Sequence, residues 1–217
     1  MGKFFKSGFT LGETLIALTI VGVISALTVP SVINNYQRKT FALAVKKNYL
    51  NIQENLTKLQ TENYRNNSIV DTTLTTNIGD FLTENFKINK DCGNSAQPCF
   101  ATEYDTINGG STNFSCNSGR NVLLANGAAI CMIQASAEAP VVTVYIDTNG
   151  TNGPNIGGRD MFTFNIYKDF SIDEFSPTEI KNATADRATL FNNNCETSYI
   201  GKGCFSKLIN DNWEMKY

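Results

Sequence analysis

Residues 11–29 read LGETLIALTIVGVISALTV, and Glu13 is the only charged side chain in this run of 19 residues. A helix of that length spans about 28 Å, close to the thickness of the hydrocarbon core of a bilayer. Lys3 and Lys6 precede the run and no acid does, so the short N-terminal end is expected to stay in the cytoplasm while the rest is exported. No A-x-A site follows at residues 29–32 (VPSV), and the apolar helix should therefore persist in the mature chain.

Glu13 is out of place in this segment. A carboxylate inside a bilayer costs on the order of a few kcal/mol, and by default it marks a function or a partner. From this residue alone two interpretations stay open: Glu13 lies at the membrane interface, or it meets a partner within the membrane.

Residues 7–13 (SGFTLGE) follow a short basic leader and precede the apolar helix. This arrangement resembles the prepilin signal of the type IV pilin and type II secretion pseudopilin superfamily. The resemblance implies that prepilin peptidase removes residues 1–8 as a leader, cutting between Gly8 and Phe9, and that Phe9 is then N-methylated. It also makes Glu13 the fifth residue of the mature chain, where the family carries a glutamate.

The resemblance further implies that Glu13 pairs with the N-terminal amine of a neighbouring subunit as the helix leaves the bilayer. Such pairing lowers the burial cost of both charges. Gly22 and Pro30 stand at the family's helix-weakening positions, and Pro30 lacks the N–H that a helix needs, so the helix should kink or loosen there. The stretch between these two residues is then expected to melt when subunits stack. The alternative is a proline that a membrane helix simply tolerates.

Beyond residue 30 the apolar residues fall on one stripe of an α-helix. The stripe consists of Phe41, Val45, Tyr49, Ile52, Leu56 and Leu59. We expect a single helix over residues 9–63, about 80 Å long. Residues 9–30 should form a transmembrane segment and filament core, and the second half should pack on a globular head of residues 64–217. A free coiled coil is the alternative, although the stripe covers fewer than three heptads.

Strand signals cluster in the second half of the head. Alternating or β-branched patterns predict four antiparallel strands, with a two-residue Asn126-Gly127 turn between the first two. The predicted strands are residues 121–125, 128–134, 140–147 and 160–168. In the polar stretch of residues 65–120, only a short helix around residues 78–86 is predicted, and the remainder reads as loop. The fold class is therefore α+β, a long N-terminal helix packed on a small antiparallel sheet, which is also what the resemblance implies.

Six cysteines lie in the exported part of the chain: Cys92, Cys99, Cys116, Cys131, Cys195 and Cys204. Thiols are oxidised outside the cytoplasm, so up to three disulfides are expected. Proximity along the chain favours the pairs Cys92–Cys99, Cys116–Cys131 and Cys195–Cys204. A loop closed by Cys195 and Cys204 near the C-terminus is also a feature of many pilins. A metal–thiolate cluster is poorly supported, since no C-x-x-C pair occurs.

Residues 147–160 (DTNGTNGPNIGGRD) connect two of the predicted strands. They offer hard oxygen ligands on a glycine-rich backbone that can wrap a cation tightly. These candidate calcium ligands are Asp147, Asn149, Asn152, Asn155 and Asp160. The segment lacks the closing glutamate of an EF-hand and is more similar to the calcium loop of G-type pseudopilins. A plain Asn/Gly turn, with side chains that cap their own backbone, stays open as the alternative.

Composition argues against several classes of function. The chain has no histidine and a formal charge of −2, which excludes imidazole catalysis and His-ligated zinc and argues against a basic nucleic-acid surface. No G-x-S-x-G or P-loop motif occurs, so no enzymatic activity and no catalytic residue are expected.

The sequence is therefore expected to encode a pilin-like structural subunit of a type II secretion pseudopilus, with a major or minor pilin of a type IV pilus as the alternative. Its expected location is the bacterial inner membrane, with a single span, a cytoplasmic N-terminus and an exported head. The expected partners are other copies and other pilin-like subunits, prepilin peptidase, the inner-membrane assembly platform and membrane lipid. Nucleic acid is expected as a partner only if the chain serves a pilus.

Overall fold

The computed structural model describes residues 8, 10–62, 69, 72–135, 140–175 and 182–217. Its contacts divide the chain into two compact units, Met1–Lys39 and Thr40–Tyr217. Helix α1 (Leu11–Glu62) contributes to both units, and its second half carries the buried residues. The long N-terminal helix predicted from the sequence is thereby confirmed.

Helix α1 runs through Pro30 without a break. The kink or loosening predicted at Pro30 stays a prediction, because an unbroken helix can still bend at a proline. A proline removes one backbone hydrogen bond, while the turns before and after it stay bonded, and an apolar helix accommodates that loss.

The second unit is built on an antiparallel sheet of six strands in the order β1-β4-β5-β6-β7-β8. A separate two-stranded ribbon pairs β2 with β3. The strands are β1 (Ile88–Gly93), β2 (Glu103–Asp105), β3 (Ser111–Asn113), β4 (Arg120–Leu124), β5 (Ala129–Gln134), β6 (Val142–Asp147), β7 (Met161–Ile166) and β8 (Ile172–Asp173). The helices after α1 are α2 (Thr73–Thr76), α3 (Ile78–Asn85), α4 (Ala183–Asn194), the 3₁₀ turn η1 (Cys195–Thr197) and α5 (Cys204–Asn210).

The four predicted strands correspond to β4, β5, β6 and β7, and the predicted short helix corresponds to α3. The prediction was incomplete elsewhere. Strands β1 and β8 flank the predicted four, and the ribbon β2–β3 lies in a stretch that was expected to be loop. Strand β1 has no buried residue and shows no alternation of buried and exposed side chains, so its sequence carries no strand signal.

The β4–β5 connection also differs from the predicted two-residue turn. The Gly127 N–H bonds to the Leu124 carbonyl at 3.0 Å, and the Leu124 N–H bonds to the Ala128 carbonyl at 2.8 Å. Three residues, Ala125 to Gly127, therefore form the loop, and Gly127 adopts φ 89°. This is the pattern of a turn followed by a left-handed residue, which hairpins use when the loop has three residues.

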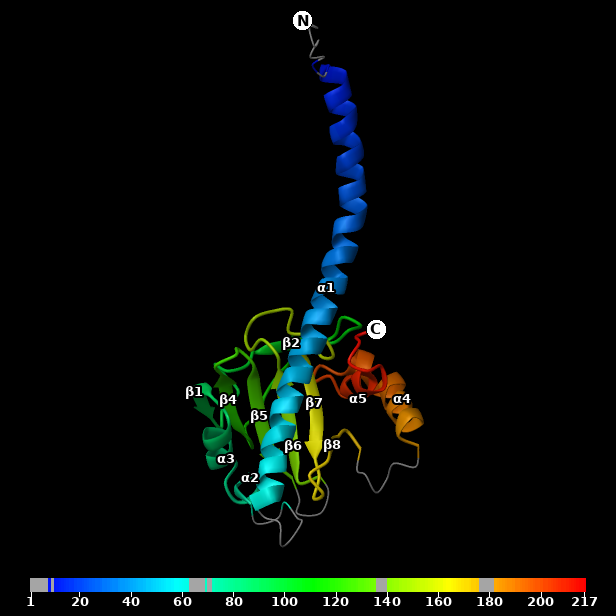
Figure 1. Cartoon of the computed structure of the whole chain (residues 1–217). Helices are drawn as coiled ribbons and strands as arrows, with labels where there is room; N and C mark the ends of the chain where they lie inside the picture. Colours follow the sequence, from blue (N-terminus) through cyan, green and yellow to red (C-terminus); the bar gives the residue numbers. More distant parts are fainter. Residues whose placement is uncertain (1–7, 9, 63–68, 70–71, 136–139, 176–181) are drawn as a thin grey trace, which may run out of the picture. The chain divides into compact units, whose positions relative to one another are not determined.

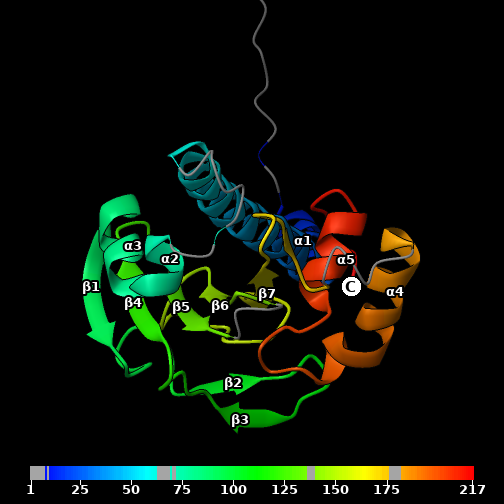
Figure 2. The same cartoon turned by 90° about the horizontal axis from the view of Figure 1, so that it is seen from below.

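The sheet lies between the second half of α1 on one face and the ribbon β2–β3 on the other (Figure 2). The buried apolar residues form two clusters. On one face, the second half of α1 covers the sheet (Figure 1), and Ile52 belongs to the same apolar cluster as Ile130 and Phe164. On the other face, Tyr104 and Phe114 pack near Cys131. Successive residues of β5 alternate between the two clusters, because side chains of a strand point to opposite faces.

Three disulfides close loops within this unit: Cys92–Cys99, Cys116–Cys131 and Cys195–Cys204. Each joins a cysteine to the next one in sequence, which is the pairing that proximity favours. Because the loops are short, each bridge adds on the order of 2–3 kcal/mol to stability in the chain-entropy account.

Candidate assembly and cation sites

The start of α1 carries the first candidate site. Gly8 is exposed, Phe9 lies outside the described residues, and Glu13 is exposed in the first turn of the helix. Glu13 Oε2 accepts hydrogen bonds from the Thr10 N–H and the Thr10 hydroxyl, both at 2.8 Å, and the Glu13 N–H donates to the Thr10 hydroxyl oxygen at 3.3 Å. This reciprocal pattern is a capping box. Sequence reasoning missed it, although the T-x-x-E spacing was a signal.

Among the described residues, no lysine or arginine forms an ion pair with Glu13; its hydrogen-bond partners are the two groups of Thr10. A carboxylate satisfied by a helix cap is tolerated in water. In apolar surroundings the same group needs a positive partner, because its lost hydration is not otherwise replaced. Within the part of the chain that the structure describes, the Glu13 carboxylate is thus held by hydrogen bonds alone.

The first half of α1 exposes nearly every large apolar side chain it has. Leu11 is 81% exposed. The others include Leu15, Ile16, Leu18, Ile20, Val21, Val23, Ile24, Leu27, Val29, Val32 and Ile33. The helix is long and apolar enough to cross a membrane. At Gly22 no atom lies within 4 Å of the place where a side chain would begin, so this position too is open to a neighbouring molecule.

The second candidate site lies between β6 and β7. Asp147 ends β6, Asp160 immediately precedes β7, and both side chains are fully buried. Burial raises the pKa of Asp147, and the Asp160 charge raises it further; burial also raises the pKa of Asp160, to about 6. The fold thus holds two acids close together at an electrostatic cost, which a bound cation would relieve.

Three side-chain oxygens of the same loop are buried without a hydrogen-bond partner: Thr148 Oγ1, Asn149 Oδ1 and Asn155 Oδ1. The two asparagines also touch the acids through their backbone, since the Asn149 N–H bonds to Asp147 Oδ1 at 2.9 Å and the Asn155 N–H bonds to Asp160 Oδ2 at 2.8 Å. An unsatisfied buried polar group costs about 1–3 kcal/mol. Orphaned oxygens beside buried acids therefore favour a ligand that accepts electron pairs.

Asn152, another predicted ligand, behaves differently. It is exposed, and its side-chain amide donates to the Asn149 carbonyl at 3.0 Å. The structure thus brings Asp147, Asn149, Asn155 and Asp160 together and leaves the Asn152 side chain at the surface.

The donor chemistry of this group fits calcium. Carboxylate and amide oxygens are hard ligands of the kind that calcium prefers, and calcium accepts main-chain and water oxygens to complete its shell. Within the described part of the chain, no three His, Cys, Asp or Glu side chains gather in one place. A cation here would therefore be held by two carboxylates, with neutral oxygens around them.

Sequence reasoning missed Tyr104. Its hydroxyl donates a hydrogen bond to Asp147 Oδ2, across 43 positions of sequence. Tyr104 lies on β2, in a stretch that reads as loop, so no local pattern connects it with the β6–β7 loop.

The disulfide loop of residues 195–204 packs tightly against the far end of the β6–β7 loop. A side chain at Gly157 would meet the Ser198 carbonyl oxygen at 2.0 Å, and one at Gly158 would meet Cys204 Sγ at 2.3 Å. These two glycines therefore permit a close approach that no larger residue allows.

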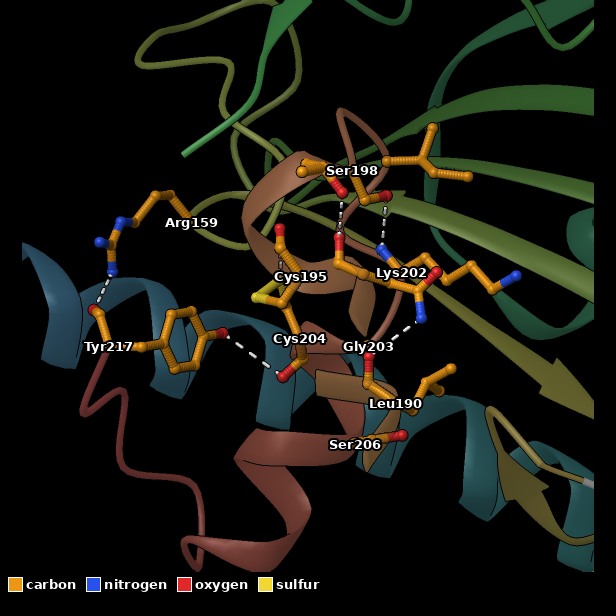
Figure 3. Close-up of a disulfide and its surroundings, with 12 residues drawn as sticks. Arg159, Leu190, Cys195, Ser198, Lys202, Gly203, Cys204, Ser206 and Tyr217 are labelled. Atoms are coloured by element: carbon orange, nitrogen blue, oxygen red, sulfur yellow. Dashed lines mark hydrogen bonds between the residues drawn. A yellow bond between two sulfur atoms is a disulfide. The ribbon is translucent and has the colours of Figure 1, made fainter. Parts of the chain in front are cut away.

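Figure 3 shows Arg159, the residue that follows these two glycines. Arg159 reaches toward Tyr217, and its guanidinium donates to the Tyr217 main-chain oxygen. The Tyr217 hydroxyl in turn donates to the Cys204 carbonyl at 3.4 Å. The C-terminal residues thus tie the β6–β7 loop to the disulfide loop.

No protein-family model matches the sequence, and comparisons with curated proteins and with solved structures find no match.

Proposed function

We propose that the chain is a pilin-like structural subunit of a type II secretion pseudopilus, processed by prepilin peptidase and polymerised through its N-terminal helix. The observation that carries this proposal is the first half of α1, an exposed apolar surface that begins at Glu13, an acid that forms no ion pair within the described part of the chain. Lipid covers such a surface before assembly, and neighbouring helices cover it afterwards. The action is mechanical, and no catalysis is part of it.

Assembly depends on two opposite charges in the processed chain: a new α-amino group and a carboxylate that is kept. Cleavage after Gly8 gives Phe9 a free α-amino group, and Glu13 keeps its carboxylate. In the single chain Thr10 caps this carboxylate; in the filament the amine of a neighbouring subunit replaces part of that cap. Neighbouring helices can pair every amine with an acid at only one shift along the filament axis. The ion pair therefore also selects how subunits stack.

The proposed location is the bacterial inner membrane, with the N-terminus cytoplasmic and the head in the periplasm or at the cell surface. Three disulfides in the second unit support an oxidising compartment. The partners would be further copies, other pilin-like subunits, prepilin peptidase, the membrane assembly platform and lipid.

The alternative function is that of a major or minor type IV pilin, which serves adhesion, motility or DNA uptake. The chain's length and its three disulfides favour this alternative, while the Asn/Gly loop with Asp147 and Asp160 favours the secretion pseudopilin. Genes for a secretin and secreted hydrolases next to this one would support the pseudopilus, whereas genes for retraction ATPases and competence would support the pilus.

A Gly8→Leu variant tests the processing step. We expect it to remain uncut, because a bulky residue replaces the small one at the scissile bond, and its N-terminal mass should include all eight leader residues. Gly12→Ala is the matched control, since Gly12 is also exposed with open space around it, and it should be cut as the native chain is. Cleavage of Gly8→Leu at the normal position would contradict the assignment.

We also propose that Asp147 and Asp160 hold a calcium ion, with the amide oxygens of Asn149 and Asn155 as further ligands. The support is the set of buried acids and orphaned oxygens described above. The ion would supply positive charge between two carboxylates that otherwise repel, and it would thereby fix the β6–β7 loop.

Calcium should raise the melting temperature of the full chain in detergent at pH 8, followed by the fluorescence of Trp213, the only tryptophan. At 100 times the dissociation constant the expected gain is about 2.7 kcal/mol, or roughly 5–10 °C for a unit of this size. The native state binds protons at Asp147 and Asp160 more tightly than the unfolded state, so the metal-free stability falls as pH rises above about 4. The contribution of Asp160 is lost as pH passes through its native pKa of about 6. Protons compete with calcium, and the gain in melting temperature should therefore be smaller at pH 5.

An Asp160→Asn variant is the control, and its melting temperature should respond only weakly to calcium. Identical melting of the native chain with calcium and with chelator at pH 8 would contradict the site.

A further inference from the structure

The ribbon β2–β3 is docked on the loop that carries the candidate calcium ligands. The Asp105 N–H donates to the Asn155 carbonyl at 2.8 Å, and the Gly157 N–H donates to the Asp105 carbonyl at 2.9 Å. These two bonds form a parallel bridge around Ile156. The ribbon therefore continues through main-chain bonds into the segment between Asn155 and Asp160.

Tyr104 is the single buried residue in the two strands of the ribbon, whose other five strand residues are exposed. Its ring packs edge-on against Phe114, with ring centroids 5.4 Å apart. Its hydroxyl donates to Asp147 Oδ2. The side chain that anchors the ribbon is thus the same one that holds a candidate ligand.

The Asp147 carboxylate is fixed from two sides. Oδ2 accepts from Tyr104 on the ribbon, and Oδ1 accepts from the Asn149 N–H in its own loop at 2.9 Å. Each carboxylate oxygen has two acceptor positions, so these bonds orient the group and still leave it electron pairs for a cation. Hydrogen bonds of this kind to a ligating carboxylate are commonly worth 10–100-fold in metal affinity.

We propose that Tyr104 is a positioning residue for the Asp147–Asp160 cation site, and that calcium binding and the docking of the β2–β3 ribbon form one linked equilibrium. This inference rests on the calcium site proposed above. A cation that needs Asp147 in its observed orientation binds the docked ribbon more tightly than the undocked one. By thermodynamic reciprocity, calcium must then favour docking by the same factor.

The linkage has a consequence for the surface of the head. Strand β3 (Ser111–Asn113) is fully exposed and polar, and its position depends on β2. Figure 2 shows the ribbon on the side of the sheet opposite α1. Calcium would therefore order a polar surface on the face of the sheet away from the second half of α1.

Tyr104→Phe isolates the hydroxyl, because the ring and its contact with Phe114 remain. Tyr145→Phe is the matched control: Tyr145 packs on the same Phe114 ring, with centroids 5.9 Å apart, and the hydroxyl that bonds to Asp147 is that of Tyr104. The full chain in detergent is titrated with calcium chloride by calorimetry. Hydrogen exchange of the peptides that contain residues 103–113 and 155–157 is followed with calcium and with chelator.

We expect calcium to slow exchange in both segments of the native chain. Tyr104→Phe should bind calcium 10–100-fold more weakly and lose most of the calcium-dependent protection of the ribbon, while Tyr145→Phe should match the native chain. Equal affinity in both variants, or calcium binding to the native chain without slower exchange in the ribbon, would overturn the linkage and leave the calcium site standing. A native chain that binds no calcium would remove the site and the linkage together. If Tyr104→Phe fails to fold, as Trp213 fluorescence would show, the exchange of the native chain alone decides.

Discussion

A Glu13→Ala variant is expected to be cleaved after Gly8 and held in the membrane, yet to form no filaments. Each subunit added to a filament of this variant would bury an α-amino group without its acid. Breaking a buried ion pair by removing one partner costs about 3–5 kcal/mol. That corresponds to a rise of roughly 100-fold to several thousandfold in the subunit concentration needed for growth. Filament yield by sedimentation and electron microscopy, beside the N-terminal mass, measures assembly and processing separately.

Thr10→Ala is the control that separates assembly from helix capping. Both variants lose the capping box, which costs about 1 kcal/mol, but Thr10→Ala keeps the carboxylate that a neighbouring amine requires. We expect filaments from Thr10→Ala and none from Glu13→Ala. Normal filaments from Glu13→Ala would refute the pairing, and equal loss in both variants would show that the cap is what matters.

Gly157→Val should strongly destabilise the head. Its Cβ would lie 2.0 Å from the Ser198 carbonyl oxygen and 2.6 Å from the Tyr199 carbonyl carbon. Backbone atoms cannot move aside as a flexible side chain does, so the disulfide loop or the β6–β7 loop must shift. Overpacking of this kind typically costs 1–3 kcal/mol. Because the clash is with backbone atoms, we expect the upper end of that range, about 3 kcal/mol, which lowers the melting temperature by roughly 6–12 °C.

Gly153→Ala is the control in the same loop. Gly153 is exposed, and no atom lies within 4 Å of its Cβ position, so this variant should melt within about 2 °C of the native chain. Equal melting temperatures for Gly157→Val and Gly153→Ala would contradict the tight packing of the two loops.

The parts of the fold that the sequence predicts are those with a strong local pattern. Helix α1 follows from an unbroken apolar run and a 3.6-residue stripe, and β6 and β7 follow from alternation with β-branched and aromatic residues. The disulfides join cysteines that are close in sequence, with separations of 7, 15 and 9 residues.

The missed parts depend on contacts between residues that are distant in sequence. Strand β1 is rich in polar residues and has no buried one, and it is a strand because it pairs with the edge of β4. The ribbon β2–β3 is held in place by contacts with distant residues. The Tyr104 hydroxyl bonds to Asp147, and Phe114 packs in the second apolar cluster. Within the candidate cation site, the two acids were visible in the sequence, whereas the Tyr104 hydroxyl that orients one of them was not.

The central claim is that a short basic leader is removed at Gly8 and that the helix behind it, acid included, enters the polymer. Mass spectrometry of the N-terminal peptide from assembled filaments tests it most directly. The account predicts a peptide that begins with N-methylated Phe9 and retains Glu13. A filament whose subunits begin at Met1, or at any residue beyond Pro30, would contradict it.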